Sequence, residues 1–462
     1  MKQVFSKNIA TAFILCAVVS FAIFSGFFPQ TSAAFSAWIT CKIANAQPGR
    51  PLATVSFSRQ NPASEMPVLT WTKTDGAVAY ELELLSQPFK DSSRSAPSSI
   101  RLFSTNRIYV TGYNADLTEI VPGNVVYWRV RALDFDRRPI SPFSDTQELY
   151  IDHQQTVVQK PVPTSFFNQS QGSSLLYPVY AWIPVAGAKQ YEVEILDDLP
   201  ENPNGIEPSV HRIDTATSSW FDYYDETPRT SDKPLYWRVR GLDANGNPVG
   251  VYSDAGAFGL SPATPVTVAT YGDSITHGGG GVSYPPSDWE YDYQHYLNFP
   301  VVNLAKSGDT SQTMVERFDQ DVLPFHPQYL IIMGGTNSLR GGVTAEDVIA
   351  DLQQLKEKCL ANNIRPIFLT LPPINPTNIK KVFDQPTAPD WQQQMRLVND
   401  FIRTQVYIDT AREFKSYNGI LLPRLAVDGL HLDMEGKRRM AAVINANWPR
   451  ITKLDWQNEN ND

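Results

Sequence analysis

The N-terminal half of the chain contains a repeat of about 110 residues. The segment WTKTDGAVAYELEL begins at Trp71 and recurs as WIPVAGAKQYEVEI at Trp182. Further on, YWRVRALD around Trp128 recurs as YWRVRGLD around Trp237. The two recurrences are offset by 111 and 109 residues, respectively. A period of this length is too long for a solenoid unit and fits a whole domain, so the repeat predicts two domains of one fold.

Each repeat has the residue pattern of antiparallel strands. In YELEL and YEVEI, and again in WRVRAL and WRVRGL, apolar residues alternate with Glu or Arg. This alternation places one face of a strand on a core and the other in water. Turn-forming clusters such as DANGNP separate the runs. We therefore expect two β-sandwiches, at residues 60–155 and 160–260, with Trp and Tyr in their cores. The Glu and Arg rows are expected to form solvated faces that pair opposite charges.

The placing of the Trp, the Tyr and the YWRVRA strand resembles that of fibronectin type III domains. The resemblance implies two antiparallel β-sandwich modules in tandem. We expect such modules to contact cell-surface glycan or protein.

From Thr264 onward, short apolar runs alternate with helical patterns. The runs are continuous in apolar character, which suits parallel strands buried on both faces, and they lie at 266–271, 301–305, 329–334, 366–371 and 406–410. Helices are expected over 344–360 with Thr344 as N-cap, over 391–405, and over 434–448 with Asp433 as N-cap. The alternation predicts an α/β domain at 264–452, with a parallel sheet between layers of helices. A polar tail follows at 453–462.

Four small polar clusters follow strands of this predicted domain. The pentapeptide GDSIT, which contains Ser274, follows the first strand, and Gly308 follows the second within NLAKSGDTS. Asn337 follows the third strand, and DGLH, with Asp428 and His431, comes after the last. Sites in such folds lie beyond the carboxyl ends of the strands. We therefore expect the four clusters to meet at one edge of the sheet.

These residue types are the ones that acyl transfer requires. The Ser274 hydroxyl is a weak nucleophile that needs an adjacent base, and His431 can take its proton because an unperturbed imidazole has a pKa of about 6.5. Asp428 can hold the imidazole tautomer and stabilise the imidazolium. The backbone N–H groups of Ser274 and Gly308 and the side-chain amide of Asn337 are candidate donors to an oxyanion.

The order of Ser, Gly, Asn and His on these elements resembles the SGNH (GDSL-type) hydrolase family, over about residues 264–450. The resemblance implies a three-layer α/β fold and a lipase, esterase or acylhydrolase that cleaves carboxylic esters. It also implies a catalytic triad of Ser274, Asp428 and His431, and an oxyanion hole of Ser274, Gly308 and Asn337. No G-x-S-x-G elbow occurs in the sequence, which argues against the α/β-hydrolase fold.

Other polar and aromatic residues near the clusters have a different expected role. Asp273 is expected to shape the turn before Ser274. His277 is the nearest rival of His431 as the base, and we expect it to be a surface histidine. Aromatic residues of the segment SYPPSDWEYDYQHYL either line a substrate groove or cover the sheet edge, and we favour the structural role; they are Trp289, Tyr291, Tyr293 and Tyr296.

The composition excludes several classes of function. The 39 Lys and Arg residues against 48 Asp and Glu give a net charge of −9, whereas a nucleic-acid binder needs a basic surface. Three Cys residues are too few for a disulfide framework or a thiolate zinc site. The glycine run 278–281 lacks the spacing of a nucleotide-binding loop. We expect no metal, no cofactor and no nucleic-acid partner.

Residues 1–46 have the pattern of an export segment. Lys2 and Lys7 precede an apolar run at 9–28, as in a secretory signal peptide. Small residues around Ala34 and Ala46 offer cleavage sites. The alternative is an uncleaved signal anchor, because a run of about 20 apolar residues can span a bilayer. Cleavage is the favoured interpretation, and either way we expect an exported protein that is periplasmic, cell-surface or secreted.

Together these observations predict an exported serine esterase or acylhydrolase that forms an acyl-enzyme. The expected substrate is a small ester, a lipid acyl ester or an O-acetylated polysaccharide. The alternative is a cell-surface binding or adhesion protein with an inactive hydrolase domain.

Overall fold

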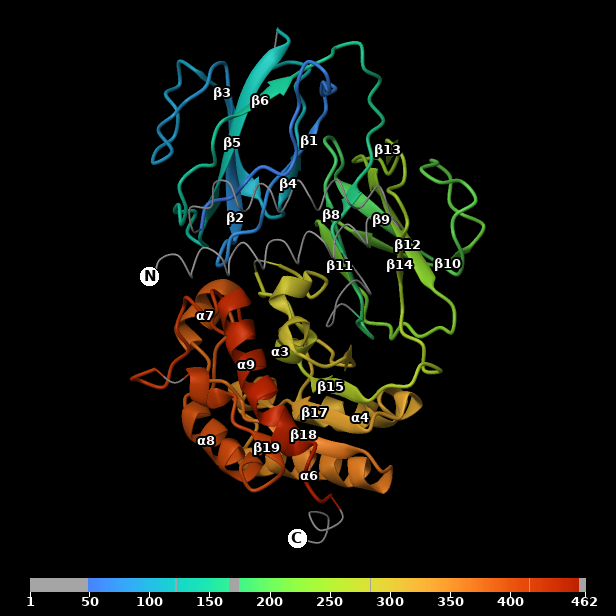
Figure 1. Cartoon of the computed structure of the whole chain (residues 1–462), viewed down its shortest axis with the longest axis vertical. Helices are drawn as coiled ribbons and strands as arrows, with labels where there is room; N and C mark the ends of the chain where they lie inside the picture. The colour runs from blue at the N-terminus through green and yellow to red at the C-terminus, as the bar shows by residue number, and fades with distance from the viewer. Residues whose placement is uncertain (1–48, 121–122, 166–173, 283, 415, 457–462) are drawn as a thin grey trace, which may run out of the picture.

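The computed structural model describes residues 49–120, 123–165, 174–282, 284–414 and 416–456. The predicted export segment at 1–46 lies outside the described residues. Within them, no helix combines the length and the apolar character that crossing a membrane requires. Figure 1 shows two β-rich units lying above a unit of mixed strands and helices.

The first repeat forms two antiparallel sheets. Its strands are β1 Val68–Thr70, β2 Ala79–Leu85, β3 Arg101–Ile108, β4 Gly112–Asn114, β5 Val125–Leu133 and β6 Gln147–Tyr150. One sheet has the order β3-β2-β5-β6, and the other pairs β1 with β4. Trp71, Tyr80 and Trp128 are buried together in one hydrophobic core, as a β-sandwich requires.

The second repeat forms a similar pair of sheets. Its strands are β7 Val162–Pro163, β8 Val179–Ile183, β9 Gln190–Leu196, β10 Arg212–Ser218, β11 Asp222–Tyr224, β12 Leu235–Leu242, β13 Pro248–Val249 and β14 Gly256–Phe258. One sheet has the order β10-β9-β12-β13, with β14 also paired to β12, and the other has the order β11-β8-β7. The likeness of both units to fibronectin type III domains stays a prediction.

The rows of Glu and Arg are paired across strands, but the expectation that they face solvent is wrong. In the first sandwich Glu83 lies opposite Arg129, and both side chains are fully buried in an ion pair of 2.8 Å. The loop between β2 and β3 covers this face of the sheet, so that Arg129 also donates to the backbone carbonyls of Asp91 and Arg94. Its guanidinium lies 3.9 Å from the ring centre of Phe143.

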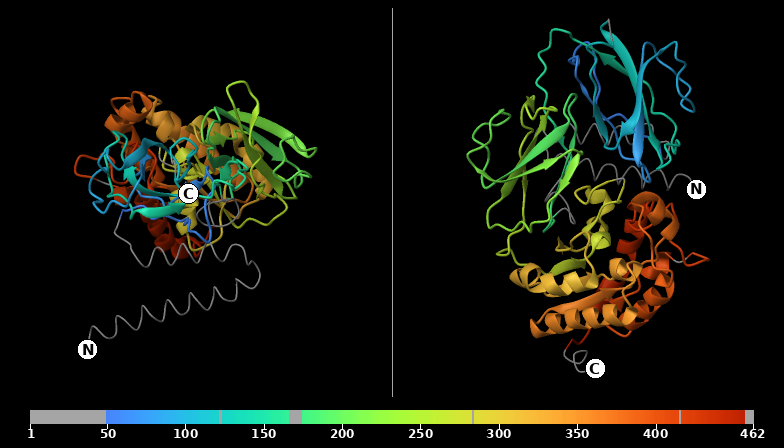
Figure 2. Two further views of the ribbon diagram at one scale, coloured as in Figure 1. Left: turned by 90° about the horizontal axis from the view of Figure 1, so that it is seen from above. Right: turned by 180° about the vertical axis from the view of Figure 1, so that it is seen from behind.

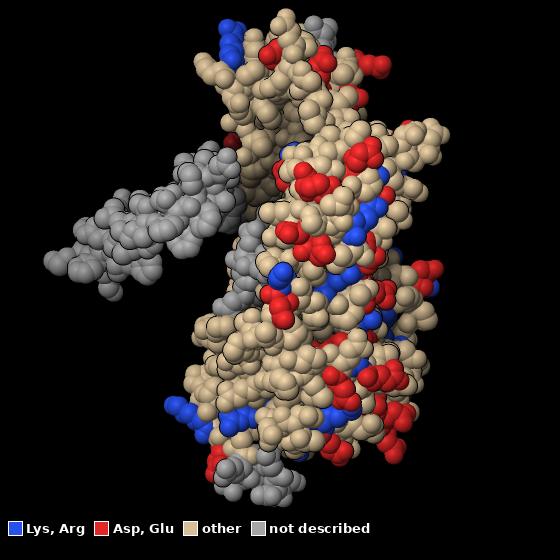
Figure 3. Space-filling model, turned by 90° about the vertical axis from the view of Figure 1, so that its right-hand side faces the viewer, with Lys and Arg blue, Asp and Glu red and all other residues tan. Residues whose placement is uncertain are grey.

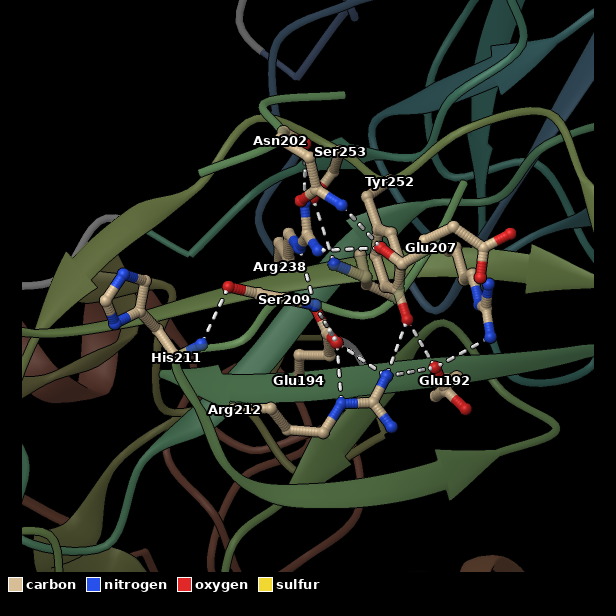
Figure 4. A network of polar contacts seen from close by, with 12 residues as sticks. Glu192, Glu194, Asn202, Glu207, Ser209, His211, Arg212, Arg238, Tyr252 and Ser253 are labelled. Carbon is tan, nitrogen blue, oxygen red and sulfur yellow. Dashed lines mark hydrogen bonds and ion pairs between the residues drawn. The ribbon is translucent and has the colours of Figure 1, made fainter. Parts of the chain in front are cut away.

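The second sandwich repeats this buried polar layer, as Figure 4 shows. Glu194 and Arg238 are both buried and form an ion pair of 2.6 Å. Arg212 donates to Glu194 and to the hydroxyl of Tyr252, whose ring packs under the Arg238 guanidinium. Buried charges are tolerated where they are paired and hydrogen-bonded, and both sandwiches meet that condition.

The third unit contains a five-stranded parallel sheet, as predicted. Its strands are β15 Val268–Gly272, β16 Val302–Asn303, β17 Tyr329–Met333, β18 Arg365–Leu369 and β19 Tyr407–Ile408. Their order is β16-β15-β17-β18-β19, and every pairing is parallel. Each of the five predicted apolar runs overlaps one of these strands. The strands β15 and β17 are buried along their whole length, which explains their continuous apolar character.

Helices cover both faces of this sheet. They are α3 Ser274–His277, α4 Ser311–Asp321, α5 Thr336–Arg340, α6 Ala345–Ala361, α7 Pro376–Phe383, α8 Trp391–Ile402 and α9 Met434–Ile451, with short 3-10 turns η1 Trp289–Tyr291, η2 Tyr293–Tyr296, η3 Leu323–Phe325 and η4 Ala411–Phe414. Helix α6 contacts both α4 and α8, whereas α9 packs on η1, η2 and η4. Figure 1 shows α9 in front of the sheet, and the view from behind in Figure 2 shows α4 and α6 in front.

The predicted helix caps are found at the expected residues. The Thr344 side chain accepts a hydrogen bond from the backbone N–H of Asp347 and begins α6. Asp433 precedes α9, but its carboxylate accepts from the backbone N–H of Val427, 2.9 Å away, and makes no capping bond within the helix. Asp433 therefore ties the start of α9 to the preceding loop.

The second sandwich is joined to the edge of the parallel sheet. The backbone N–H of Leu176 donates to the carbonyl of Asn303 in β16 at 2.9 Å, and that of Asn303 donates to Ser174 at 3.1 Å. Leu176 and Tyr177 belong to the hydrophobic core of the third unit. This segment covers the open hydrogen-bonding groups of an edge strand.

On the face drawn in Figure 3, acidic and basic side chains are interspersed.

Candidate active site

Ser274, His431 and Asp428 form a continuous chain of hydrogen bonds. The Ser274 hydroxyl lies 2.8 Å from Nε2 of His431, and Nδ1 of His431 lies 2.7 Å from the Asp428 carboxylate. An ionised carboxylate only accepts, so Nδ1 carries a proton and Nε2 is free to accept the proton of Ser274. Asp428 is fully buried, whereas Ser274 is 9% exposed. The structure brings together the three residues that the sequence predicts as a triad.

The DGLH segment holds its own carboxylate in place. The second oxygen of Asp428 accepts from the backbone N–H groups of Leu430 and His431, both at 2.8 Å. Gly429, which follows Asp428 directly, has φ +83°, a conformation that L side chains rarely adopt. The tight turn therefore lets one carboxylate orient both the backbone and the imidazole of His431.

Ser274 lies at the point where β15 ends and α3 begins. The Asp273 carboxylate accepts from the backbone N–H of Ile275 at 3.0 Å, which shapes this turn as expected. Burial raises the pKa of Asp273 to about 6, because the charged form is desolvated. No hydrogen bond joins Asp273 to His431, so the carboxylate that faces the imidazole is that of Asp428.

The predicted oxyanion donors line the same pocket as Ser274 and His431. Gly308 has φ +92°, and it borders the pocket together with Asn337. In the part of the chain that the structure describes, the backbone N–H groups of Ser274 and Gly308 have no hydrogen-bond acceptor. Both N–H groups are therefore available to a developing negative charge.

Two neighbours fix the orientation of the Asn337 amide. Its Nδ2 donates to the backbone carbonyl of Asp309 at 2.9 Å, and its Oδ1 accepts from Nε of Arg340 at 3.1 Å. A guanidinium only donates and a carbonyl only accepts, so the amide cannot turn over without losing both bonds. One N–H of Asn337 remains for a ligand in the pocket.

The pocket itself is small, about 330 Å³. Residues that the sequence interpretation missed form much of its wall: Tyr284, Pro286, Ser307, Arg340, Phe383, Gln385 and Leu430. Arg340 stands three residues after Asn337 on α5, and this helical spacing is a signal that could have identified it. Tyr284 offers no such signal, because the fold alone brings its loop to the pocket.

The structure corrects the expectation for His277. Its side chain is fully buried and not on the surface. Nδ1 lies 2.7 Å from the Ser307 hydroxyl, and Nε2 lies 2.7 Å from the backbone carbonyl of Tyr177. Burial lowers the pKa of His277 to about 4. The reason for the difference is the second sandwich, which packs Tyr177 and Tyr224 over this histidine.

The aromatic segment after the glycine run has the favoured structural role. Tyr291 and Tyr293 are fully buried, and Tyr296 donates to the carbonyl of Glu290 at 2.7 Å. Within the described ranges, no three His, Cys, Asp or Glu side chains converge as metal ligands.

Part of the chain matches known proteins. Residues 270–439 match the model of the GDSL-like Lipase/Acylhydrolase family. The uncharacterized lipoprotein YqeF of Bacillus subtilis (strain 168) is 30% identical over 126 residues, which cover 23% of this chain and 49% of that protein. The match thus spans about half the length of this curated relative.

Solved structures also resemble the third unit. A GDSL-like lipase from Bacteroides thetaiotaomicron is 21% identical, with a TM-score of 0.32, over 40% of this chain and 88% of that chain. Axe2, an acetylxylan esterase from Geobacillus stearothermophilus, is 21% identical, with a TM-score of 0.31, over 42% of this chain and 96% of that chain.

The C-terminal unit is therefore a GDSL-like lipase/acylhydrolase (SGNH) domain with a parallel sheet. The match to this family supports a hydrolase activity on ester bonds for this unit.

Proposed function

We propose that the chain is an exported serine esterase in which Ser274, His431 and Asp428 are the catalytic triad. The observation that carries the proposal is the pair of hydrogen bonds, 2.8 and 2.7 Å long, that joins the three side chains in the order hydroxyl, imidazole, carboxylate. A base within this distance of the nucleophile meets the geometric condition for general-base catalysis.

In this mechanism the Ser274 oxygen bonds to the ester carbonyl carbon while His431 takes the hydroxyl proton. The carbonyl oxygen becomes an oxyanion, to which the backbone N–H groups of Ser274 and Gly308 and the Asn337 amide donate. His431 then gives its proton to the departing alkoxide, which leaves an acyl-enzyme on Ser274. Water, deprotonated by His431, releases the acid and restores the serine. Asp428 stabilises the imidazolium in both halves.

The pocket favours a short acyl group on a polar carrier over a long lipid chain. Its volume is about 330 Å³, and Ser307, Asn337, Arg340 and Gln385 give its wall a polar side. The Arg340 guanidinium donates to Asn337 and to Gln385, and no carboxylate of the described residues pairs with it. A guanidinium with unused donors suits the hydroxyl or carboxylate oxygens of a substrate. We infer that O-acetyl groups on carbohydrate are the preferred substrate class.

Labelling with a fluorophosphonate and an ester panel test the proposal. Ser274 should be labelled in the parent chain, and His431→Ala should abolish the labelling. Esters of p-nitrophenol from acetate to palmitate, beside acetylated xylan and a lysophospholipid, should show turnover that falls steeply with acyl length. Failure to label Ser274 would instead support a binding or adhesion protein with an inactive hydrolase domain. Preference for palmitate would overturn the substrate class but not the mechanism.

A further inference from the structure

Tyr284 belongs both to the active-site pocket and to the first sandwich. It lines the pocket with Ser274 and His431, yet it is 4% exposed and forms part of the hydrophobic core of residues 63–151. A wall of the candidate active site is thus packed into another domain.

Two side chains of the first sandwich hold this loop from outside the hydrolase domain. The hydroxyl of Tyr80 is hydrogen-bonded to that of Tyr284, and it also accepts from the backbone N–H of Thr74 at 3.1 Å. Lys73 pairs with Asp288, lies 3.6 Å from Glu290 and stands over the ring of Tyr284. A hydrogen bond and an ionic cluster therefore fasten residues 284–290 to the sandwich.

From this fastened segment the chain leads directly to the triad. The backbone N–H of Gly280 donates to the carbonyl of Tyr284 at 2.9 Å. Gly281 has φ +64°, and a Cβ there would overlap the Asp428 carboxylate and lie 2.8 Å from Nδ1 of His431. The backbone at Gly281 thus packs against the hydrogen bond between His431 and Asp428 and covers it on one side. Exclusion of water strengthens the electrostatic interactions of such a pair.

The tandem repeat contains an internal comparison for these contacts. Tyr191 of the second sandwich occupies the place of Tyr80, and its hydroxyl accepts from the backbone N–H of Val185 at 3.2 Å. Both tyrosines are almost fully buried beside the repeat tryptophan. Among the described residues the Tyr191 hydroxyl has no partner in the hydrolase domain, and Pro184 stands where the first sandwich has Lys73. The extra contacts occur only in the repeat that meets the active-site loop.

We propose that Tyr80 and Lys73 are positioning residues for ester hydrolysis, which hold Tyr284 as a pocket wall and Gly281 against the triad. The first sandwich is then a structural part of the active site. This inference rests on the proposed function.

The test compares Tyr80→Phe with Tyr191→Phe in the full chain. Each substitution removes one hydroxyl that accepts from a backbone N–H, and Tyr80→Phe also removes the bond to Tyr284. Both variants should stay folded, with a thermal midpoint below that of the parent. The kcat for p-nitrophenyl acetate is measured per Ser274 titrated with fluorophosphonate, which removes any loss of folded protein from the comparison. We expect Tyr80→Phe to lower this kcat about fivefold or more and Tyr191→Phe to leave it within about twofold of the parent value.

Lys73 supplies a second measurement in the same assay. Lys73→Met should lower kcat per titrated site, and Lys73→Arg should restore most of it because the charge is kept. Equal kcat values for the Tyr80 and Tyr191 variants, or full activity in Lys73→Met, would overturn the positioning role. A parent chain that the phosphonate does not label would overturn the proposed function, and this inference with it.

Discussion

At the scale of single residues, orientation matters as much as identity. Arg340 and Asp309 hold the two ends of the amide of Asn337, the proposed oxyanion donor. One oxygen of Asp428 accepts from two backbone N–H groups of its own turn, which holds the other oxygen toward His431. Each side chain at the site is thus restrained by a neighbour that does not itself react, which is the usual condition for pre-organised catalysis.

Removal of the Asn337 amide tests the oxyanion assignment. We expect Asn337→Ala to lower kcat by about 100-fold or more, or roughly 3 kcal/mol of barrier, as for other oxyanion donors. Steady-state kinetics with p-nitrophenyl acetate measure the effect, and a thermal midpoint within a few degrees of the parent serves as the folding control. Activity above a third of the parent value would contradict the assignment.

The burial of His277 should make the free energy of unfolding of the chain sensitive to acid. Its pKa is about 4 in the folded chain, because burial disfavours the charged imidazole, against about 6.5 when unfolded. Between these values the unfolded state binds more protons, so stability rises with pH across the window and is lost on acidification. The full contribution is about 3 kcal/mol.

Denaturation by urea at pH 7 and at pH 4.5 measures this contribution. His277→Gln should be less stable than the parent at pH 7, but it should lose less stability on acidification. His326→Gln, at an exposed site, should keep the pH dependence of the parent. If His277→Gln loses as much unfolding free energy between pH 7 and pH 4.5 as the parent does, other groups cause the acid sensitivity.

At the scale of elements, the loops account for the buried ionic layer and the candidate active site more than the strands do. The β2–β3 loop changes a polar sheet face into a buried ionic layer. The turn after β15 presents Ser274, and contacts of residues 278–282 and 284–291 join the proposed triad to the first sandwich. The strands and long helices supply the frame, and the connections supply the site, as is general for α/β folds.

Arg129 tests the energetic weight of the buried layer. Arg129→Met removes the buried partner of the fully buried Glu83, which keeps only Arg101 at 3.5 Å and the backbone N–H of Ala96. We therefore expect a loss of about 3 kcal/mol in the free energy of unfolding. The control is Arg94→Met in the same loop, where Arg94 is 78% exposed in its pair with Asp91 and the expected loss is below about 1 kcal/mol. Urea denaturation measures both. Equal losses in the two variants would show that the pair at Glu83 is not the stabilising contact.

At the scale of the whole molecule, the three units share their cores. Tyr284, Tyr291 and Met434 of the hydrolase domain lie in the core of the first sandwich. Leu176 and Tyr177 of the second sandwich lie in the core of the hydrolase domain. Neither sandwich is attached by a linker alone, and separation of either unit would expose buried aromatic surface.

This sharing predicts cooperative unfolding. Scanning calorimetry of the full chain should show the first sandwich and the hydrolase domain unfolding in one transition, because neither core is complete alone. Lys73→Met should then shift that transition as a whole. Two resolved transitions, of which Lys73→Met moves only one, would show that the domains unfold independently.

Much of the fold and the three residues of the proposed triad were accessible from local patterns. The 110-residue repeat, the five apolar runs and the caps at Thr344 and Asp433 each depend on residues close together in the chain. The clustering of Ser274, Gly308, Asn337 and His431 follows because parallel strands end at a common edge.

Helix α7 was not predicted, although Asn375 and Pro376 form a regular N-terminal signal.

Three features followed from no local pattern and came only from long-range packing. They are the burial of Glu83 with Arg129, the burial of His277 under Tyr177, and the position of Tyr284, which lines the candidate active-site pocket and packs in the core of the first sandwich. Periodicity tells which residues share a face, but it does not tell what covers that face. Covering depends on contacts between segments that are far apart in the chain, such as Tyr80 and Tyr284, which are 204 residues apart. Such contacts form only when the domains meet.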